Sequence, residues 1–484
     1  MIEKRKLIEV ALPLDVINKE AAREKSIRAG HPSTLHLWWA RRPLAACRAV
    51  LFASLVDDPS THPDLFSTEA DQDKERDRLF DLIERLVLWE NSNNRDLLDA
   101  TWTEIEKSCG SEVPTVIDPF SGGGSIPLEA LRLGLRVDAS DLNPVAVLIN
   151  KALVELPPKF SGRKPVHPDL QANVDIRPWT GAQGLAEDVR AYAQWINDEA
   201  EARIGKLYPD VAVPGRRGSE RARVIAWLWA RTITCPNPAC KSTMPLLNSF
   251  SVSRKSGREA WLRAIPDRAS RSVNFSIDYG PGCPLDGTVN RRGATCLVCN
   301  ESTPLVRVRQ ASKAGDLGSQ LLCTVADGHG QRIYVAAGEE QVRAARVVPP
   351  GNVPDGELSR NPRDIMTPNY GMTHLAQLFT SRQLWAMTTF CNLVTEARER
   401  VLADGGARDY ADAIATYLTL GIGRLANRCS SQSFWNATAE KTEQVFARQA
   451  LSMIWVYSDP DIATNHQQAV LAVSGAPDGA DGVG

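Results

Sequence analysis

The segment 118–124, DPFSGGG, sets one carboxylate before three consecutive glycines. Glycines let a backbone approach a ligand where a Cβ would clash, and the start of a helix behind them offers free N–H groups. Residues 113–117 predict a short buried strand before this loop. Residues 125–133 predict an amphipathic helix after it, with Pro127 in its first turn and Gly134 just past its end. The order of strand, glycine loop and helix predicts a turn that binds a nucleoside.

A second acidic residue narrows the choice of ligand. Residues 135–139 predict the next strand, and Asp141 follows it, 23 residues after Asp118. An acid at this place can accept hydrogen bonds from both hydroxyls of a ribose. A dinucleotide fingerprint fails because Pro127 stands where its third glycine belongs, and the segment contains no G-K-[ST] of a phosphate loop. Asp118 would repel a pyrophosphate but attract an ammonium or a sulfonium.

The residues therefore predict S-adenosylmethionine as the cofactor, because it carries both cations and a ribose. The alternative is a strand–helix–strand unit whose glycine turn is merely tight. Either way, the local fold is α/β.

Four of the ten cysteines are spaced as metal ligands. Cys235 and Cys240 form C-x4-C, and Cys296 and Cys299 form C-x2-C, which together supply the four thiolates of a tetrahedral zinc site. The 55 residues between the pairs predict an inserted hairpin. A site closed by four thiolates leaves no position for water, so we expect the zinc to be structural; the alternative is four unligated thiols. The other cysteines are expected to be spare ligands (Cys283 and Cys323) or ordinary buried thiols (Cys47, Cys109, Cys391 and Cys429).

The rest of the chain must position these two sites. With 484 residues, 43% of them hydrophobic, the chain is long enough for about three domains. Residues 58–112 predict a solvated helical insert, 185–196 and 411–426 predict helices, and 305–308 and 333–337 predict short strands. We expect a helical N-terminal region at 1–112, a cofactor-binding part at 113–215, a basic zinc-ribbon insertion at 216–350, a helical region at 351–457 and a disordered tail at 458–484.

Positive charge gathers in the insertion. From Arg216 to Gln310 the sequence contains 16 Lys or Arg and 6 Asp or Glu, a net charge of +10, although the whole chain carries −2. This asymmetry favours a surface that neutralises the phosphates of double-stranded DNA. The alternative is a solvated basic face with no partner.

Longer motifs resemble a known family. DPFSGGG followed by ASDLNPVAVLINKA resembles motifs I and II of amino-group DNA methyltransferases, which methylate adenine N6 or cytosine N4. LIEVALPLDVIN, HPSTLHLWWARRPL, GMTHLAQLFTSRQL and SFWNATAEKTEQVFARQALSMIW are similar to the adenine-specific members that contain a zinc ribbon. The resemblance runs from about residue 5 to residue 457.

The resemblance implies a Rossmann-like methyltransferase core and, by analogy, a setting in restriction–modification or phage defence. It assigns the cofactor contacts to the motif I residues and the ribose to Asp141, with Asn143 and Pro144 on the adenine side. The candidate cofactor-binding residues are Asp118, Pro119, Phe120, Ser121, Gly122, Gly124, Asp141 and Asn143.

The motif at 31–44, HPSTLHLWWARRPL, is dense in aromatic and basic residues. In related methyltransferases a motif before motif I closes over the cofactor, and an Arg there can pair with the methionine carboxylate. Arg41 and Arg42 are both candidates. The alternative is a helix start whose Trp38 and Trp39 pack in the core while the arginines face solvent.

The catalytic motif of the family, [DNS]-P-P-[YFW], does not occur. In the family it holds the flipped target base by stacking and accepts the hydrogens of its amine. Pro157-Pro158, Pro349-Pro350 and the segment 458–461 lack its flanking residues, and the sequence departs from the family pattern after Tyr457. Either the catalytic half is lost or a second chain supplies it. The sheet is then incomplete beside the motif I strand, so we expect the isolated chain to be poorly soluble or inactive.

Three functions stay open: a DNA adenine methyltransferase or its cofactor-binding half, a zinc-ribbon DNA-binding or regulatory protein that binds S-adenosylmethionine without chemistry, and an RNA or protein methyltransferase. No apolar run approaches the length of a membrane span, and the N-terminus lacks the apolar region of a signal peptide. We therefore expect a cytoplasmic protein with no membrane partner.

Overall fold

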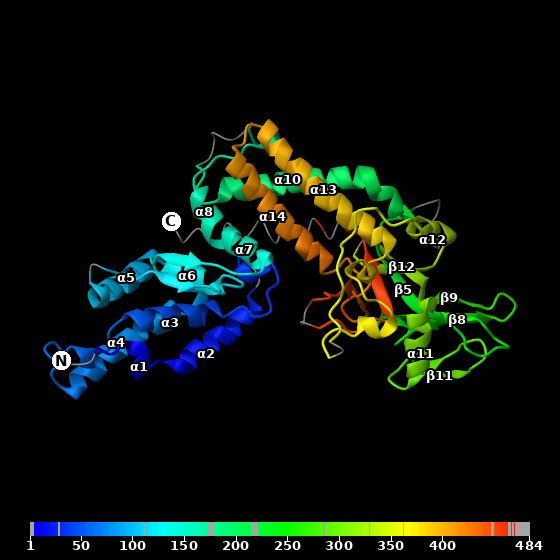
Figure 1. The fold of residues 1–484 in the computed structure, drawn as a ribbon, viewed down its shortest axis with the longest axis horizontal. Helices are drawn as coiled ribbons and strands as arrows, with labels where there is room; N and C mark the ends of the chain where they lie inside the picture. The colour runs from blue at the N-terminus through cyan, green and yellow to red at the C-terminus, as the bar shows by residue number, and fades with distance from the viewer. Residues whose placement is uncertain are drawn as a thin grey trace. The chain divides into compact units, whose positions relative to one another are not determined.

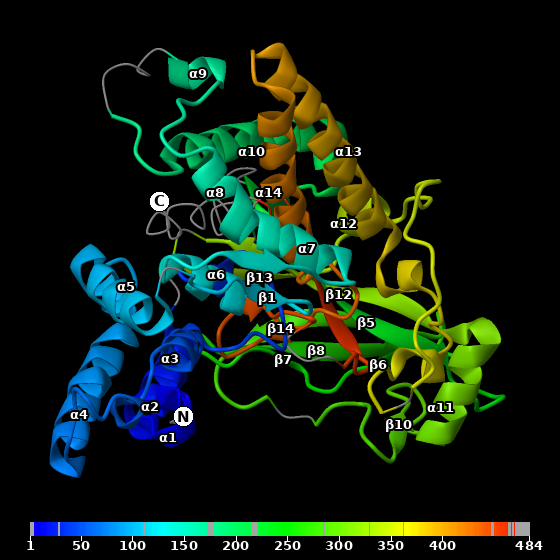
Figure 2. The ribbon, with the colours of Figure 1, turned by 60° about the vertical axis from the view of Figure 1, so that its left-hand side comes forward.

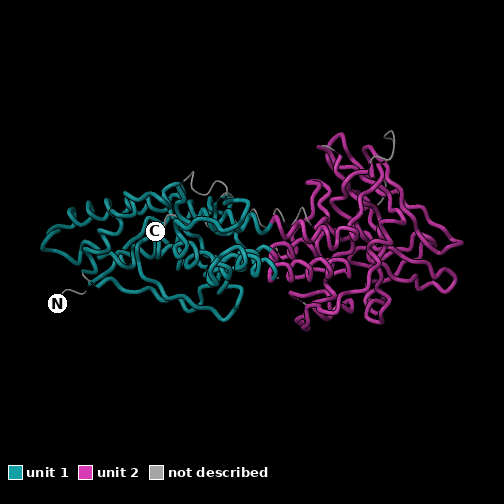
Figure 3. The backbone as a smooth tube through the Cα atoms, turned by 90° about the horizontal axis from the view of Figure 1, so that it is seen from above, with its two compact units in different colours: residues 1–193, 396–421, 470–484 teal, residues 194–395, 422–469 magenta. Residues whose placement is uncertain are grey.

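The computed structural model describes residues 4–462, apart from 28–29, 111, 172–177, 214–220, 284–285, 329, 362 and 447–449, together with His466 and Ala469. The chain divides into two compact units (Figure 3). Unit 1 comprises residues 1–193, 396–421 and 470–484, and unit 2 comprises residues 194–395 and 422–469. The predicted disordered tail starts too early, because residues 458–460 belong to a buried strand. Residues 470–484 of that tail, like Arg216 and Arg217 of the basic segment, lie outside the described residues.

Unit 1 begins with helices that share one apolar core (Figure 1). The stretch 58–112 is helical as predicted, but it is not simply solvated: α4 exposes its charged face and buries Leu79, Leu82, Ile83 and Leu86 in this core. The insert therefore helps to hold the N-terminal region together. The helices are α1 (Leu7–Val10), α2 (Leu14–Arg23), α3 (Leu44–Leu55), α4 (Glu69–Leu86) and α5 (Arg95–Cys109), with 3-10 turns at Glu24–Ser26, Pro32–Thr34, Pro59–Thr61 and Trp89–Asn91.

The predicted strand–loop–helix–strand unit is present, but the prediction that its first strand is buried is wrong, because Ile117 at its centre is 72% exposed. β1 (Val116–Asp118) pairs in parallel with β2 (Val137–Ala139), and α6 (Ser125–Arg132) connects them. A buried ion pair joins α6 to α3, with Arg48 Nε 2.6 Å from Glu129 Oε2. Among the described strands β1 pairs with β2 alone, so its other edge is open. One parallel pair is not a Rossmann-like sheet, and the fold class stays a prediction.

The remaining helices of unit 1 follow β2 and return from the C-terminal half of the chain. Asp188 ties them together, because its carboxylate accepts from Tyr410 Oη (2.7 Å) and from the backbone N–H groups of Val166 and His167. The boundary between the units falls inside three of the helices, α10, α13 and α14. The elements are α7 (Pro144–Asn150), a π-helical turn (Lys151–Glu155), α8 (Leu156–Lys159), α9 (Pro168–Gln171), α10 (Gln183–Ile204), α13 (Ser381–Ala403) and α14 (Arg408–Ala426).

Unit 2 is built on an antiparallel sheet with strand order β13-β12-β5-β16, to which β6 adds by pairing with β5 (Figure 2). The long central strand β5 is buried on both faces, because alternate side chains enter two different cores. Ala226, Leu228 and Ala230 enter one core, and Trp227 and Trp229 enter the other. The strands are β5 (Val224–Thr234), β6 (Thr243–Leu246), β12 (Gly318–Asp327), β13 (Arg332–Ala336) and β16 (Val456–Pro460).

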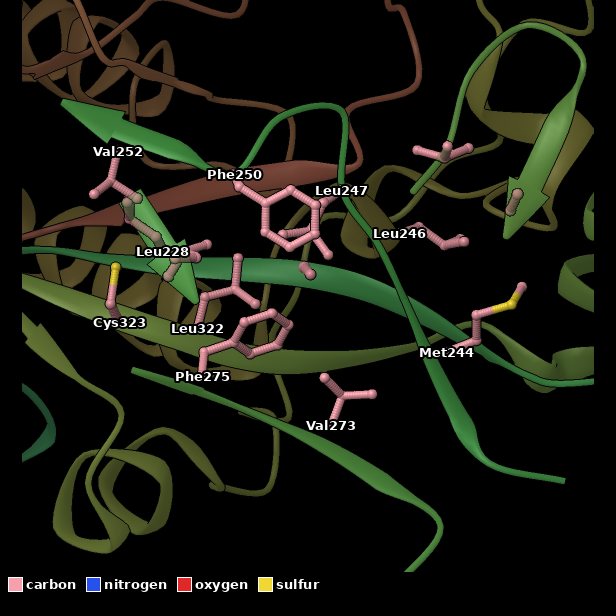
Figure 4. Packing of buried hydrophobic residues seen from close by; sticks show 14 of the residues in the cluster. Leu228, Met244, Leu246, Leu247, Phe250, Val252, Val273, Phe275, Leu322 and Cys323 are labelled. Carbon is pink, nitrogen blue, oxygen red and sulfur yellow. The ribbon is translucent and has the colours of Figure 1, made fainter. Parts of the chain in front are cut away.

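A second, three-stranded sheet packs on the Leu228 side of β5, where Phe250, Phe275 and Leu322 fill the space between the sheets (Figure 4). Its β8–β9 hairpin is the insertion that the spacing of the cysteine pairs predicted. The sheet contains β7 (Ser251–Ser253), β8 (Ala260–Asp267) and β9 (Ser272–Tyr279). Short pairs join β3 (Val211–Ala212) to β4 (Arg221–Ala222), β10 (Gly293–Thr295) to β11 (Ser302–Pro304), and β14 (Trp435–Asn436) to β15 (Lys441–Thr442).

One strand prediction is wrong. Residues 305–308 lie in a helix, α11 (Leu305–Ala311), whereas the strand predicted at 333–337 is confirmed as β13. The run LVRV is rich in Val and Leu, as short strands are, but the helix buries Val308 in the core and exposes Val306. A four-residue apolar run cannot separate the two structures. The other elements of unit 2 are α12 (Glu339–Ala345), a π-helical turn (Ser312–Asp316), and 3-10 turns at Gly205–Leu207, Thr367–Tyr370 and Leu375–Leu378.

Candidate functional site

The predicted loop leaves β1 and is tied to the end of β2 by backbone hydrogen bonds. Ser140 N donates to Asp118 O, and Ser121 N donates to Ser140 O, each over 3.0 Å. The Ser121 hydroxyl donates to the same carbonyl, also over 3.0 Å. Asp118 Oδ1 accepts from Phe120 N (3.2 Å). Ser121 therefore has a structural part in the loop, while the neighbouring Pro119 is exposed.

Asp141 holds the glycine loop from the end of β2. Asn143 N (2.8 Å) and Gly122 N (2.9 Å) donate to its two carboxylate oxygens. These two hydrogen bonds, that from Asn143 first, keep the pKa of Asp141 below its ordinary value. Asn143 itself caps α7, since its Oδ1 accepts from Val145 N (2.9 Å). A carboxylate offers about four acceptor positions, so Asp141 retains capacity for a ligand.

Two loop glycines have left-handed backbones, with φ of +49° at Gly122 and +75° at Gly124. A Cβ on Gly122 would lie 2.6 Å from Trp38 Nε1, and one on Gly124 would lie 3.0 Å from Asn150 Oδ1. Asn150 also donates to Gly122 O (3.1 Å). These positions therefore need glycine for the loop's own packing. Nothing in the sequence pointed to Asn150, because its contact depends on how α7 folds back.

The motif at 31–44 lies against this loop. A Cβ on Gly123 would come within 3.1 Å of the Arg41 guanidinium, and Ser125 Oγ donates to Arg42 O (2.7 Å). All three guanidinium nitrogens of Arg41 are buried, and none has a hydrogen-bond partner among the described residues. Burial lowers the pKa of Arg41 to about 10, which leaves it charged at neutral pH. A buried cation without a partner is costly, so this guanidinium is a candidate anion-binding group.

The start of the same motif is structural. His31 is 3% exposed, and its Nε2 lies 2.9 Å from Glu24 Oε1. The Glu24 carboxylate also accepts from Leu44 N (3.0 Å) and Ala45 N (3.1 Å), the first N–H groups of α3. Burial alone would raise the pKa of Glu24, but the hydrogen bonds from His31, Leu44 and Ala45 outweigh it and lower that pKa.

Glu24→Gln is expected to destabilise unit 1 by about 1–3 kcal/mol at pH 7, because a hydrogen-bonded charge is lost from a buried site. Folding lowers the pKa of Glu24, so its stabilisation is complete well above the unfolded pKa of about 4.3 and is lost as pH falls through and below it. The difference between the wild type and Glu24→Gln in urea unfolding should therefore shrink from pH 7 to pH 4. Glu84→Gln, on the exposed face of α4, is the control; a constant difference across this range would contradict the assignment.

Three large apolar side chains in and next to the loop are exposed to solvent. Phe120 is 77% exposed, Leu142 is 93% exposed and Ile117 is 72% exposed. Apolar surface of this size next to a glycine loop is unusual unless something covers it. Leu142 follows Asp141 in the chain, and Phe120 lies two residues before Gly122, whose N–H donates to Asp141.

Four cysteine thiols form the second site, in unit 2. The Sγ atoms of Cys235, Cys240, Cys296 and Cys299 all lie within 4.8 Å of one another. Cys235 Sγ is 3.6 Å from Cys299 Sγ, and Cys240 Sγ is 3.9 Å from Cys296 Sγ. Tetrahedral zinc with Zn–S bonds of about 2.3 Å separates its sulfurs by about 3.8 Å. The predicted set is brought together, and it could hold a metal ion such as zinc.

Each cysteine pair lies at the end of a hairpin with the same backbone pattern. Cys235 N donates to Ser242 O, and Cys296 N donates to Glu301 O, each over 2.9 Å. The residue after each second cysteine has a left-handed backbone, with φ of 51° at Lys241 and 61° at Asn300. The Ser242 hydroxyl lies 3.1 Å from Cys240 Sγ and lowers the pKa of that thiol to about 7. The two turns thus present their thiols toward a common point.

The other cysteines differ in part from expectation. Neither Cys283 nor Cys323 belongs to the cluster. Cys47 and Cys429 are buried as predicted, but Cys109 is half-buried and Cys391 is exposed, so the prediction is wrong for these two.

The basic segment is only partly available to a polyanion. Arg231 is 6% exposed, and Arg223 pairs with Asp461. The exposed basic side chains that form no ion pair with a described residue include Lys241, Arg258, Arg268, Arg271, Arg291, Arg292 and Arg307. DNA binding stays a prediction.

The segment 458–461, the nearest approach to a catalytic motif, lies in unit 2, where β16 pairs with β5. Asp459 is 1% exposed in β16, where it pairs with the buried Arg382. Its Oδ2 is therefore committed to the fold, while its Oδ1 is buried without a hydrogen-bond partner among the described residues. Among the described residues, no helix is both long and apolar enough to cross a membrane.

Comparisons with known proteins add one match. A family described as "Protein of unknown function (DUF1156)" matches residues 11–82, which include the motif at 31–44. No curated protein and no solved structure matches the chain.

Proposed function

We propose that the loop of unit 1 binds S-adenosylmethionine, and that the protein takes part in DNA methylation at adenine N6. This chain would supply the cofactor site and contacts to double-stranded DNA. The observation that carries the proposal is the buried, unpartnered guanidinium of Arg41 beside Gly123, with the Asp141 carboxylate on the neighbouring Gly122 N–H.

The residues around the loop match the parts of this ligand. Arg41 would pair with the carboxylate of the methionine part, and Asp118 would attract its ammonium. Asp141 would accept hydrogen bonds from the ribose hydroxyls, and the exposed Phe120 and Leu142 would cover the adenine. When bound, the cofactor supplies a methyl group on a positively charged sulfur. The chain's own residues bind and orient it and exclude water from one side.

We propose that the four cysteines hold a structural zinc. Four thiolates complete the coordination shell and leave no place for a reacting water. The metal would then fix the two hairpins of unit 2 and so position the basic side chains nearby.

A second candidate is a DNA-binding or regulatory protein that binds the same cofactor without chemistry. The pairing of Asp459 with Arg382 favours it for this chain alone, because the sequence contains no [DNS]-P-P-[YFW] motif that would accept the target amine. A second chain carrying that motif could pair with the open edge of β1 and restore the first function.

Asp141→Asn is expected to weaken S-adenosylmethionine binding by about tenfold to a hundredfold, because a hydrogen bond to a charged group contributes about 1.5–3 kcal/mol. Isothermal titration calorimetry measures the dissociation constant. Asp138→Asn, an exposed residue of β2, makes the same change of charge nearby and should leave the affinity unchanged.

Asp141 also accepts a hydrogen bond from the loop backbone, so Asp141→Asn changes the loop as well as the ligand contact. A second variant that leaves the loop intact is therefore needed. Phe120→Ala removes an exposed ring and is expected to weaken binding on the order of fivefold through lost stacking. Wild-type affinity in both Asp141→Asn and Phe120→Ala would overturn the proposal, as would a wild-type chain that does not bind the cofactor.

A further inference from the structure

Unit 2 contains a cleft of about 1050 Å³ that neither the cysteine cluster nor the loop uses. Its lining includes residues of β5, β6, β9, β12 and β16, of α12, of the start of α13 and of the loops between them. The cleft is too large for a single small ion, because sites for whole organic ligands are about 300–1000 Å³. The side chains that line the cleft determine which ligand it would bind.

The second half of β5 contributes Trp229 and Arg231 to the cleft, on one face of the sheet. The neighbouring strands add Tyr457, opposite Trp229, and Ser319, opposite Arg231. The rings of Trp229 and Tyr457 are stacked, with centroids 6.4 Å apart and planes 8° apart, and Tyr457 is 3% exposed. Trp229 is 92% buried, and its indole N–H has no hydrogen-bond partner among the described residues.

Arg231 is a buried cation without a counter-charge. It is 6% exposed and donates to neutral oxygens: Ile454 O (2.9 Å), Ser431 O (2.9 Å) and Ser431 Oγ (3.0 Å). No carboxylate of the described residues lies within 4 Å of it. Asp459 also lines the cleft, but Arg382 neutralises it. An uncompensated buried cation is expensive unless an anion accompanies it.

The opening is lined by exposed charges of both signs, namely one carboxylate, Glu339, and two arginines. Arg343 and Arg346 of α12 line the cleft, are exposed, and form no ion pair with a described residue. The start of the 23-residue helix α13 lines the opposite side with Thr380 and Ser381. Thr380 Oγ1 accepts from Gln383 N (3.1 Å), while the first two N–H groups of the helix have no intrahelical partner.

We propose that this cleft binds a nucleotide, with its phosphate held by Arg231, Arg343 and Arg346 and its base lying beside Trp229. The chemistry is a phosphate ester joined to a planar ring. Its source is a free nucleotide or one unit of a single strand, and the experiment separates the two. The inference does not depend on cofactor binding in unit 1.

The full chain is titrated by calorimetry with thymidine 5′-monophosphate, thymidine, inorganic phosphate and a five-residue oligothymidylate. A pyrimidine is chosen because it does not mimic adenosine at the loop of unit 1. Thymidine 5′-monophosphate is expected to bind more tightly than either of its parts. Tighter binding of the oligothymidylate, with a steeper salt dependence, identifies a strand as the source; equal binding identifies the free nucleotide.

Arg343→Gln with Arg346→Gln is expected to weaken binding by about tenfold or more, because charge-assisted hydrogen bonds to the phosphate are lost. The matched control is Arg360→Gln with Arg363→Gln, two exposed arginines of unit 2 that do not line the cleft. Ser319→Asp places a carboxylate at an exposed position opposite Arg231 and is expected to abolish binding. Equal affinity in the two double variants, unchanged binding in Ser319→Asp, or no binding to the wild type would overturn the proposal.

Discussion

Replacing Cys240 and Cys299 by serine is expected to remove the bound metal and to unfold the hairpin that carries the second cysteine pair. This hairpin consists of β10 and β11, three residues each, and a pair of this length is not stable on its own. A structural zinc contributes about 10–16 kcal/mol in small zinc-binding peptides. The effect here should be smaller and local, because Cys296 and Val298 also pack into the core of unit 2.

The measurement is the zinc content of the purified chain, together with hydrogen exchange over residues 286–311. We expect close to one zinc per wild-type chain, none in the double variant, and fast exchange in that segment. Cys109→Ser with Cys391→Ser is the matched control, since neither thiol belongs to the cluster. A wild-type chain without metal whose exchange is unaffected by a chelator would show that the thiols pack without a metal.

The sequence predicted the cysteine cluster and the glycine loop, but it did not predict which arginine lies against the loop. The cysteine pairs were predictable because each is a local pattern, and each hairpin orients its own two thiols. The glycine loop was predictable for the same reason. Arg41 could not be chosen over Arg42 from the sequence, because the choice depends on how a segment some 80 residues earlier packs against Gly122 and Gly123.

The same distinction explains the wrong predictions. The apolar run at 305–308 is a local pattern that fits a strand. The segment forms a helix, which buries Val308 in a core made by distant parts of the chain. The insert 58–112 looked solvated because its charges are frequent, yet Leu82 and Leu86 lie on one face of α4 and complete a core formed by other helices. Tyr457 marked the end of the family pattern, and the strand that contains it could be found only from its pairing with β5.

Asp459→Ala is expected to destabilise unit 2 by about 3–5 kcal/mol, because it leaves a charged arginine buried without a partner. Arg382 is fully buried, and its Nη2 and Nε lie 2.6 and 3.0 Å from Asp459 Oδ2. The guanidinium packs against the rings of Tyr208 and Trp227, 4.7 and 4.3 Å from their centroids. Those rings cannot replace the lost charge. Urea unfolding followed by tryptophan fluorescence reports the change, because Trp227 lies against the pair.

Replacing both partners tests whether the cost comes from the unpaired charge. Arg382→Met with Asp459→Leu removes both charges while keeping apolar volume, and it is expected to be clearly less destabilising than Asp459→Ala alone. Glu357→Ala breaks the exposed pair with Arg360 and should change stability by about 0.5 kcal/mol or less. If the double variant were as unstable as the sum of its single variants, the pair would not be coupled. Asp459 would then be free for chemistry in the cleft it lines.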